Sequence, residues 1–160
     1  MEVNERDVRG RKCAVEMATS AEGIVKLIEL FTNGLCEPLA LELHNRIGLP
    51  IYSIYDPSAA VERWGVDYWH SLVKVSDDCF LSARGLHTER ETIEYWAAAW
   101  KDPSLLEHAV LVPRTPVLSG TGDYEIDRCM TEMWGDPCTI QPHTAQFAAM
   151  LLKAHGIPKQ

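Results

Sequence analysis

Hydrophobic residues in the first third of the chain recur at helical spacing in two successive stretches. Between residues 20 and 33 the apolar positions return every three or four residues, and Ser20 can cap the start of such a helix. Asn33 and Gly34 interrupt this pattern. A second pattern runs from Cys36 to Ile47, and a proline in its first turn is typical of a helix start. The chain is therefore predicted to begin with two short helices joined by a tight turn.

The pattern after the second helix changes to one that favours strands. Gly48 ends the helix, and residues 51–55 are rich in β-branched and aromatic side chains. Residues 68–75 and 79–83 have the same character and are separated by the polar turn at residues 76–78. We therefore expect one strand followed by an antiparallel hairpin.

A helix is predicted after this hairpin, because Thr88 and Glu91 form a capping box before an apolar stripe that Asp102-Pro103 ends. Residues 109–112 are apolar and fit one more strand or a sheet edge. The remaining expectations are loops at 56–67 and 113–123, a short helix at 124–134 and a terminal helix at 143–155.

Few strands among several helices predict an α+β fold, in which a small antiparallel sheet packs against the helix that begins at Cys36. A length of 160 residues with 46% hydrophobic content suits a single domain spanning residues 1–160. Residues 1–18 are polar, and we interpret them as a loosely attached arm or a short helix.

Charge and composition limit the kinds of partner and the compartment expected for the protein. Fifteen basic and 23 acidic residues give a net charge of −8, which disfavours binding to nucleic acid. No apolar run approaches the roughly 20 residues that a membrane span needs, and the charged N-terminus does not resemble a signal peptide. Five cysteines without a CxxC pair favour a reducing compartment, so we expect a cytoplasmic protein.

Cys36 is the strongest candidate for a functional residue, because it lies where a helix is predicted to begin. Unpaired backbone N–H groups and the positive end of the helix dipole favour a thiolate there, which lowers the pKa of a cysteine. The alternative interpretation is a buried cysteine that acts only as a small hydrophobic side chain.

A thiolate nucleophile needs a base or an ion-pair partner, and His70 is the best candidate. It lies at the head of the predicted hairpin, 34 residues after Cys36, where a side chain at a strand end can face the start of a packed helix. His44 is less suitable, because it follows Cys36 by eight residues on the same helix, about 12 Å along the axis at ~1.5 Å per residue.

Four motifs follow one another in this order: Cys-x-x-Leu-Ala-x-x-Leu from Cys36, Ile-Gly-Leu-Pro before the first strand, His-Ser-Leu-Val-Lys-Val from His70, and Cys-Phe-Leu-Ser-Ala-Arg-Gly from Cys79. The ordered set resembles the papain-like cysteine peptidases, particularly their transglutaminase-like branch. The resemblance covers residues 20–88.

This resemblance implies that Cys36 is the nucleophile and that His70 is the general base or ion-pair partner. The third position in the family is an Asp or Asn on the strand after the histidine, and here that place holds Ser82. A serine can orient an imidazole but carries no charge to stabilise an imidazolium. Asp77 and Asp78 are nearby alternatives, although acids in such a position are usually turn residues.

Asn33 is a candidate for the oxyanion hole, because its amide could donate to a developing oxyanion together with the backbone N–H of Cys36. The other interpretation is that Asn33 only ends the first helix beside Gly34. No cofactor or metal is expected, since the cysteines and histidines at 79, 87, 129, 138 and 143 match no usual zinc spacing.

Two functions from different classes fit these features. The first is a cysteine-dependent hydrolase or acyl transferase that acts on an amide, isopeptide or thioester in a protein or a small acyl substrate. The alternative is a catalytically inactive binding module of the same fold, a small acidic inhibitor or immunity-type protein that docks on a protein partner. The net charge and Ser82 favour the second, whereas a reactive thiol at Cys36 would favour the first. The sequence leaves the oligomeric state open.

Overall fold

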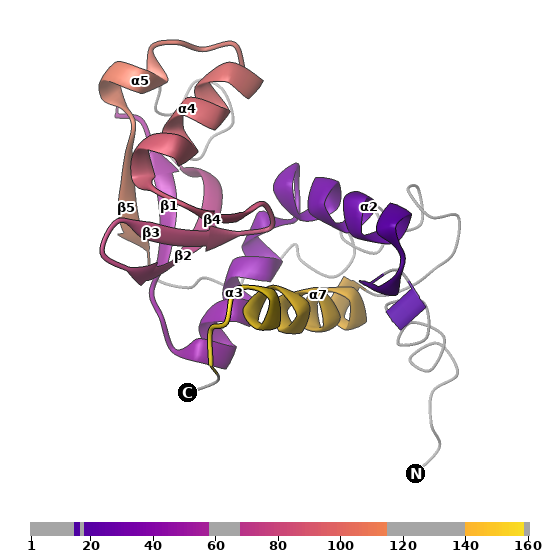
Figure 1. Ribbon diagram of the computed structural model, residues 1–160. Coiled ribbons are helices and arrows are strands. Elements are labelled where there is room, and N and C mark those ends of the chain that lie inside the picture. The colour runs from indigo at the N-terminus through magenta and orange to yellow at the C-terminus, as the bar shows by residue number, and fades with distance from the viewer. Residues whose placement is uncertain (1–14, 17, 58–67, 115–139, 159–160) are drawn as a thin grey trace.

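A computed structural model of the chain describes residues 15–16, 18–57, 68–114 and 140–158. In this part of the chain, five helices and five strands form an α+β fold around an open antiparallel sheet with the strand order β4-β3-β2-β1-β5 (Figure 1). The predicted α+β class with a small antiparallel sheet is therefore confirmed.

The bounds of the elements agree closely with the local signals in the sequence. The helices are α2 (Ala21–Thr32), α3 (Cys36–Ile47), α4 (Glu89–Ala99), α5 (Leu105–His108) and α7 (Ile140–Ala154). The strands are β1 (Ile51–Tyr55), β2 (Tyr68–Ser76), β3 (Cys79–Ser82), β4 (Gly85–His87) and β5 (Val110–Arg114). The terminal helix begins three residues earlier than the sequence predicted.

Helix caps account for several of these bounds. The Ser20 hydroxyl accepts a hydrogen bond from the N–H of Gly23 at 3.0 Å, which satisfies a donor in the first turn of α2. The capping box of α4 is complete, because Thr88 and Glu91 each accept a hydrogen bond from the other's backbone. Gly48 ends α3 in the left-handed conformation, with φ 68°.

Two short elements were not predicted, β4 and the single turn α5. Ser82 pairs with Gly85, so only Ala83 and Arg84 join β3 to β4. Gly85 adopts φ 99°, a conformation that favours glycine. A three-residue strand is too short to display an alternating pattern, and a one-turn helix is too short to display helical periodicity.

Helices cover both faces of the sheet (Figure 1). On one face, Val73 of β2 belongs to a hydrophobic cluster with residues of α2, α3 and α7, in which the rings of Phe31 and Phe147 stack at 5.3 Å. On the other face, Leu72 of β2 belongs to a second cluster with Trp96 of α4 and residues of α5. Successive residues of β2 therefore point toward different helical layers.

β5 forms one edge of the sheet and pairs with β1 along its whole length. The backbone N–H of Leu111 donates to the Glu89 carboxylate at 2.9 Å. Two residues further on, Pro113 has no N–H to donate. Glu89 lies in the first turn of α4, so this contact also ties α4 to the edge strand.

Some expectations fall outside the described residues. They concern the arm at residues 1–14 and 17, most of the loop at 56–67, most of the loop at 113–123 and the short helix at 124–134.

Candidate functional site

Cys36 is the first residue of α3, as the sequence predicted. The preceding residue, Leu35, makes no side-chain capping bond, so it leaves the first backbone N–H groups of α3 to other partners. Cys36 is half-buried. The helix dipole at this position favours negative charge on the sulfur, whereas the neighbouring Glu37 carboxylate opposes it.

A polar link connects the start of α3 to the two central strands. The Ser71 hydroxyl on β2 donates to Oε2 of Glu37 at 2.6 Å. Because this bond uses the Ser71 proton, the Ser53 hydroxyl on β1 is the donor in the 3.1 Å contact between the two serines. Both serines are buried. This link was not predicted, although small polar residues inside two apolar strands are a signal for it in the sequence.

His70 precedes Ser71 on β2, and its side chain points to the other face of the sheet. The centroid of the imidazole lies 4.7 Å from that of Trp96, a residue of α4. His70 is only 4% exposed, and its Nδ1 atom has no hydrogen-bond partner. The ring is therefore held by packing rather than by an orienting hydrogen bond.

The charge state of His70 follows from this setting. Burial, and secondly the positive charge of Arg84, lower the pKa of His70 from 6.5 to about 3. The imidazole is consequently neutral at physiological pH, a form that can accept a proton. It does not carry the positive charge that an ion pair with a thiolate would need.

Ser82, the residue expected to orient His70, lies on the same face of the sheet as His70. Val73 pairs with Leu81, and Lys74 pairs with Phe80. Continuing this register by one residue puts Ser82 opposite Leu72. The Ser82 hydroxyl nevertheless accepts a hydrogen bond from the N–H of Arg84 at 3.2 Å, within the β3–β4 turn. Within the described part of the chain, it makes no hydrogen bond to His70.

The structure places Asn33 at the end of α2, where its N–H donates to the carbonyl of Glu29 at 2.9 Å. Its side chain is exposed and makes no hydrogen bond to any residue that the structure describes. This geometry matches the helix-ending interpretation of Asn33, and it provides no contact for the oxyanion role.

Two of the other residues considered as candidates, His44 and Asp78, make hydrogen bonds that support neighbouring elements. Nδ1 of His44 donates to the carbonyl of Leu49 at 2.6 Å, which ties the end of α3 to the chain that follows it. Asp78 accepts a hydrogen bond from the N–H of Glu89 at 2.9 Å, so it supports the first turn of α4. Asp77 is exposed in the turn.

The predicted placement of Cys36 at a helix start is confirmed, whereas its predicted pairing with His70 stays a prediction. The Glu37–Ser71 bond brings the first turn of α3 to the strand that carries His70. The imidazole itself faces α4, and no hydrogen bond joins it to Cys36 in the described residues. In unliganded enzymes, catalytic hydrogen bonds are often long and tighten only when substrate binds.

Among the described residues, no group of three or more His, Cys, Asp or Glu side chains could hold a metal ion. Two of the cysteines considered as zinc ligands, at 129 and 138, lie outside those residues. No helix in the described ranges is long and apolar enough to cross a membrane. Comparisons with family models, curated proteins and solved structures find no match.

Proposed function

We propose that the protein is a cysteine-dependent hydrolase or acyl transferase, in which Cys36 is the nucleophile and His70 the base. The observation that carries this proposal is the 2.6 Å hydrogen bond between Ser71 and Glu37. Glu37 directly follows the proposed nucleophile Cys36, and Ser71 directly follows the proposed base His70. The bond therefore joins these two segments, although they lie 34 positions apart in the sequence. The resemblance to papain-like and transglutaminase-like proteins points to the same pair.

In the proposed reaction, the Cys36 sulfur attacks the carbonyl carbon of an amide, isopeptide or thioester, and the thiol proton passes to neutral His70. The bond to the leaving amine or thiol then breaks, and His70 returns the proton to it. Water or an acceptor amine attacks the resulting thioester, loses a proton through His70 and releases Cys36 as the thiol. The N-terminus of α3 stabilises negative charge on the sulfur during these steps.

The test is the pH dependence of iodoacetamide alkylation at Cys36, located by peptide mass mapping. We expect Cys36 to react below the usual thiol pKa of ~8.5, because the N-terminus of α3 favours the thiolate and neutral His70 can remove the thiol proton. It should react more slowly in His70→Gln, which keeps a side chain of comparable size. Cys79 is an internal control, because it is half-buried at the far end of β3. An inert Cys36, or one indifferent to His70→Gln, would contradict the proposal.

A binding module of the same fold is the second candidate. Its supporting observations are the low pKa of His70 and the engagement of Ser82 in the turn, which leave the imidazole without a charged partner. A net charge of −8 would suit a basic protein partner. Loss of acyl-transfer activity in Cys36→Ala would exclude this candidate as the main function, whereas unchanged activity would exclude the enzyme.

A further inference from the structure

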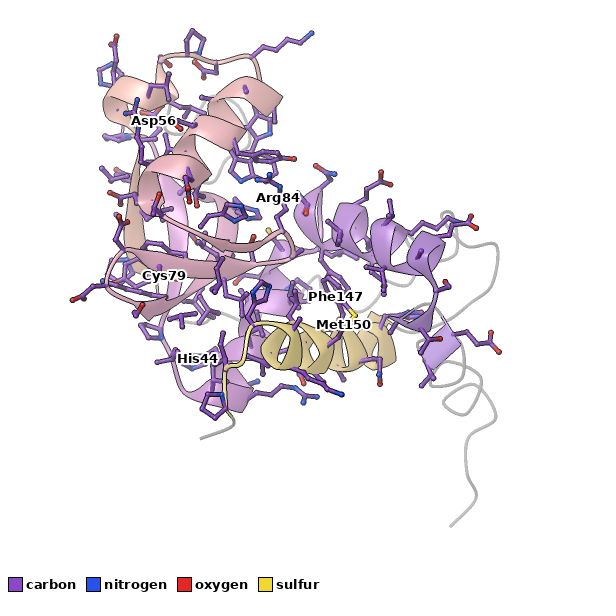
Figure 2. All side chains as sticks on the ribbon, viewed as in Figure 1. His44, Asp56, Cys79, Arg84, Phe147 and Met150 are labelled. Atoms are coloured by element: carbon purple, nitrogen blue, oxygen red, sulfur yellow. The ribbon has the colours of Figure 1, made fainter. Side chains whose placement is uncertain are left out.

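Arg84 occupies an unusual position beside the proposed site. It lies in the two-residue turn between β3 and β4, and its guanidinium carbon is 3.2 Å from the centroid of the Tyr95 ring on α4. Figure 2 shows Arg84 and Cys79 at the two ends of β3. The stacking fixes a side chain that would otherwise be mobile on the surface.

The charge of Arg84 is not used within the described part of the chain. None of the ion pairs there includes Arg84, whereas Arg46 and Arg90 each contact a glutamate at 2.7 Å. An arginine left without a carboxylate is notable in a chain with 23 acidic residues. A guanidinium that lies flat on an aromatic ring keeps its N–H edge available for a bidentate carboxylate.

The side chains of Arg84 and His70 both lie against α4. The positive charge of Arg84 contributes to lowering the pKa of His70, so the guanidinium lies within electrostatic range of the imidazole. His70 packs on Trp96 and Arg84 packs on Tyr95, so both side chains lie on the α4 face. The buried Nδ1 atom of His70 has no partner there. A carboxylate bound by Arg84 would therefore lie next to the proposed base.

We propose that Arg84, held on Tyr95, binds a carboxylate of the substrate, so that the protein acts on acyl groups with an acid close to the scissile carbonyl. This inference rests on the proposed function, because it assigns a specificity to the Cys36–His70 site. The protein as a whole repels anions, and a single oriented arginine is a direct means of selecting an acidic substrate at one place.

Two small alkylating reagents test the inference. Iodoacetate carries a carboxylate next to the carbon that the thiol attacks, and iodoacetamide is its neutral counterpart. We expect the ratio of iodoacetate to iodoacetamide rates at Cys36, normalised to the same ratio at Cys79, to fall on the order of fivefold in Arg84→Gln. Arg84→Gln also changes the field at His70, but both reagents meet the same base, so the ratio removes that effect.

Arg90→Gln is the matched control, because Arg90 is an exposed arginine already paired with Glu94, and its ratio should equal that of the wild type. High ionic strength should reduce the wild-type ratio toward that of Arg84→Gln. A Cys36 that alkylates readily with an unchanged ratio in Arg84→Gln would overturn the carboxylate subsite and leave the proposed function standing. A Cys36 inert to both reagents would overturn the proposed function itself.

Discussion

His70 is an imidazole in an environment that opposes its charged form. It is buried against Trp96, and its Nδ1 atom has no hydrogen-bond partner. A buried polar atom without a partner typically costs about 1–3 kcal/mol. In Cys–His sites a carboxylate or amide at this atom orients the ring and favours the imidazolium. Ser82 lies on the correct face for this task, but its oxygen is engaged by the Arg84 backbone.

Ser82→Asp should therefore supply the missing group. A carboxylate near Nδ1 favours the charged imidazole, so the pKa of His70 should rise from about 3, and Cys36 should alkylate faster at neutral pH. The pKa is measured by NMR titration of the ring. Ser82→Asn is the matched variant, because it has nearly the same shape without the charge and should raise the pKa less. A pKa that does not move in Ser82→Asp would show that position 82 cannot reach the ring.

His70 also makes the free energy of unfolding depend on pH. Its pKa is about 3 when folded and 6.5 when unfolded, so only the unfolded chain binds the proton between these values. This contribution is fully present above pH 6.5 and is lost as the pH falls toward 3. The loss is about 1.4 kcal/mol per pH unit. His143, whose pKa burial also lowers, acts in the same direction.

Urea unfolding at pH 7.5 and at pH 5.5 measures this effect. In His70→Phe, the free energies of unfolding at the two pH values should differ less than in the wild type, because the group that binds the proton is gone. His108→Gln should leave the difference as in the wild type, since His108 is exposed. Equal pH dependence in wild type and His70→Phe would contradict a buried neutral imidazole.

At the scale of elements, local signals in the sequence predicted most of the described fold. The Ser20 cap, the Thr88 capping box and Gly48 act within one or two turns of chain, so their outcome does not depend on distant contacts. These predictions were confirmed, as was the start of α3 at Cys36. Short elements such as β4 contain too few residues to produce a recognisable period.

The direction of the His70 side chain could not be predicted in the same way. Helices cover both faces of the sheet, so β2 has apolar partners on both sides and its sequence shows no clean alternation of polar and apolar residues. A shift of one residue in the assignment of faces exchanges His70 and Ser71. The start of α3 at Cys36 and the strand that carries His70 were thus predictable, whereas the direction of each side chain depends on tertiary packing.

The link between α3 and β2 predicts a test at the level of these two elements. Ser71→Ala removes the donor to Glu37 and the acceptor for Ser53, so it should lower the free energy of unfolding by about 1–3 kcal/mol. It should also slow alkylation of Cys36, because the start of α3 loses its anchor. Ser76→Ala, an exposed position on the same strand, should stay within about 0.5 kcal/mol of the wild type. A stable Ser71→Ala would show that packing alone holds α3.

At the scale of the whole molecule, the sheet separates two hydrophobic clusters, and the proposed site lies where β2 extends past the end of β3. α2, α3 and α7 contribute to one cluster, and α4 and α5 contribute to the other. Cys36 belongs to the first group of helices, while His70 packs on the second. Relative movement of these layers would therefore change the distance between Cys36 and His70.

The outer side of β5 suggests a prediction about association. Leu111 donates its N–H to Glu89, and Pro113 has no N–H, so both positions lack a donor for another chain. The double variant Glu89→Ala and Pro113→Thr should restore both donors and increase self-association with concentration, measured by sedimentation velocity. Pro158→Thr, an exposed proline outside the sheet, is the control. A double variant that sediments like the wild type would show that this edge is protected in another way.

The same two residues limit how the protein can recognise a peptide. Many proteins capture an extended peptide by adding it as a further strand, which requires donors and acceptors along an exposed edge. At Leu111 and Pro113 of β5 an incoming strand would meet acceptors but no available donor. At these positions backbone pairing is therefore limited to the carbonyl acceptors, so side-chain contacts must supply more of the selection of a peptide than in full strand addition.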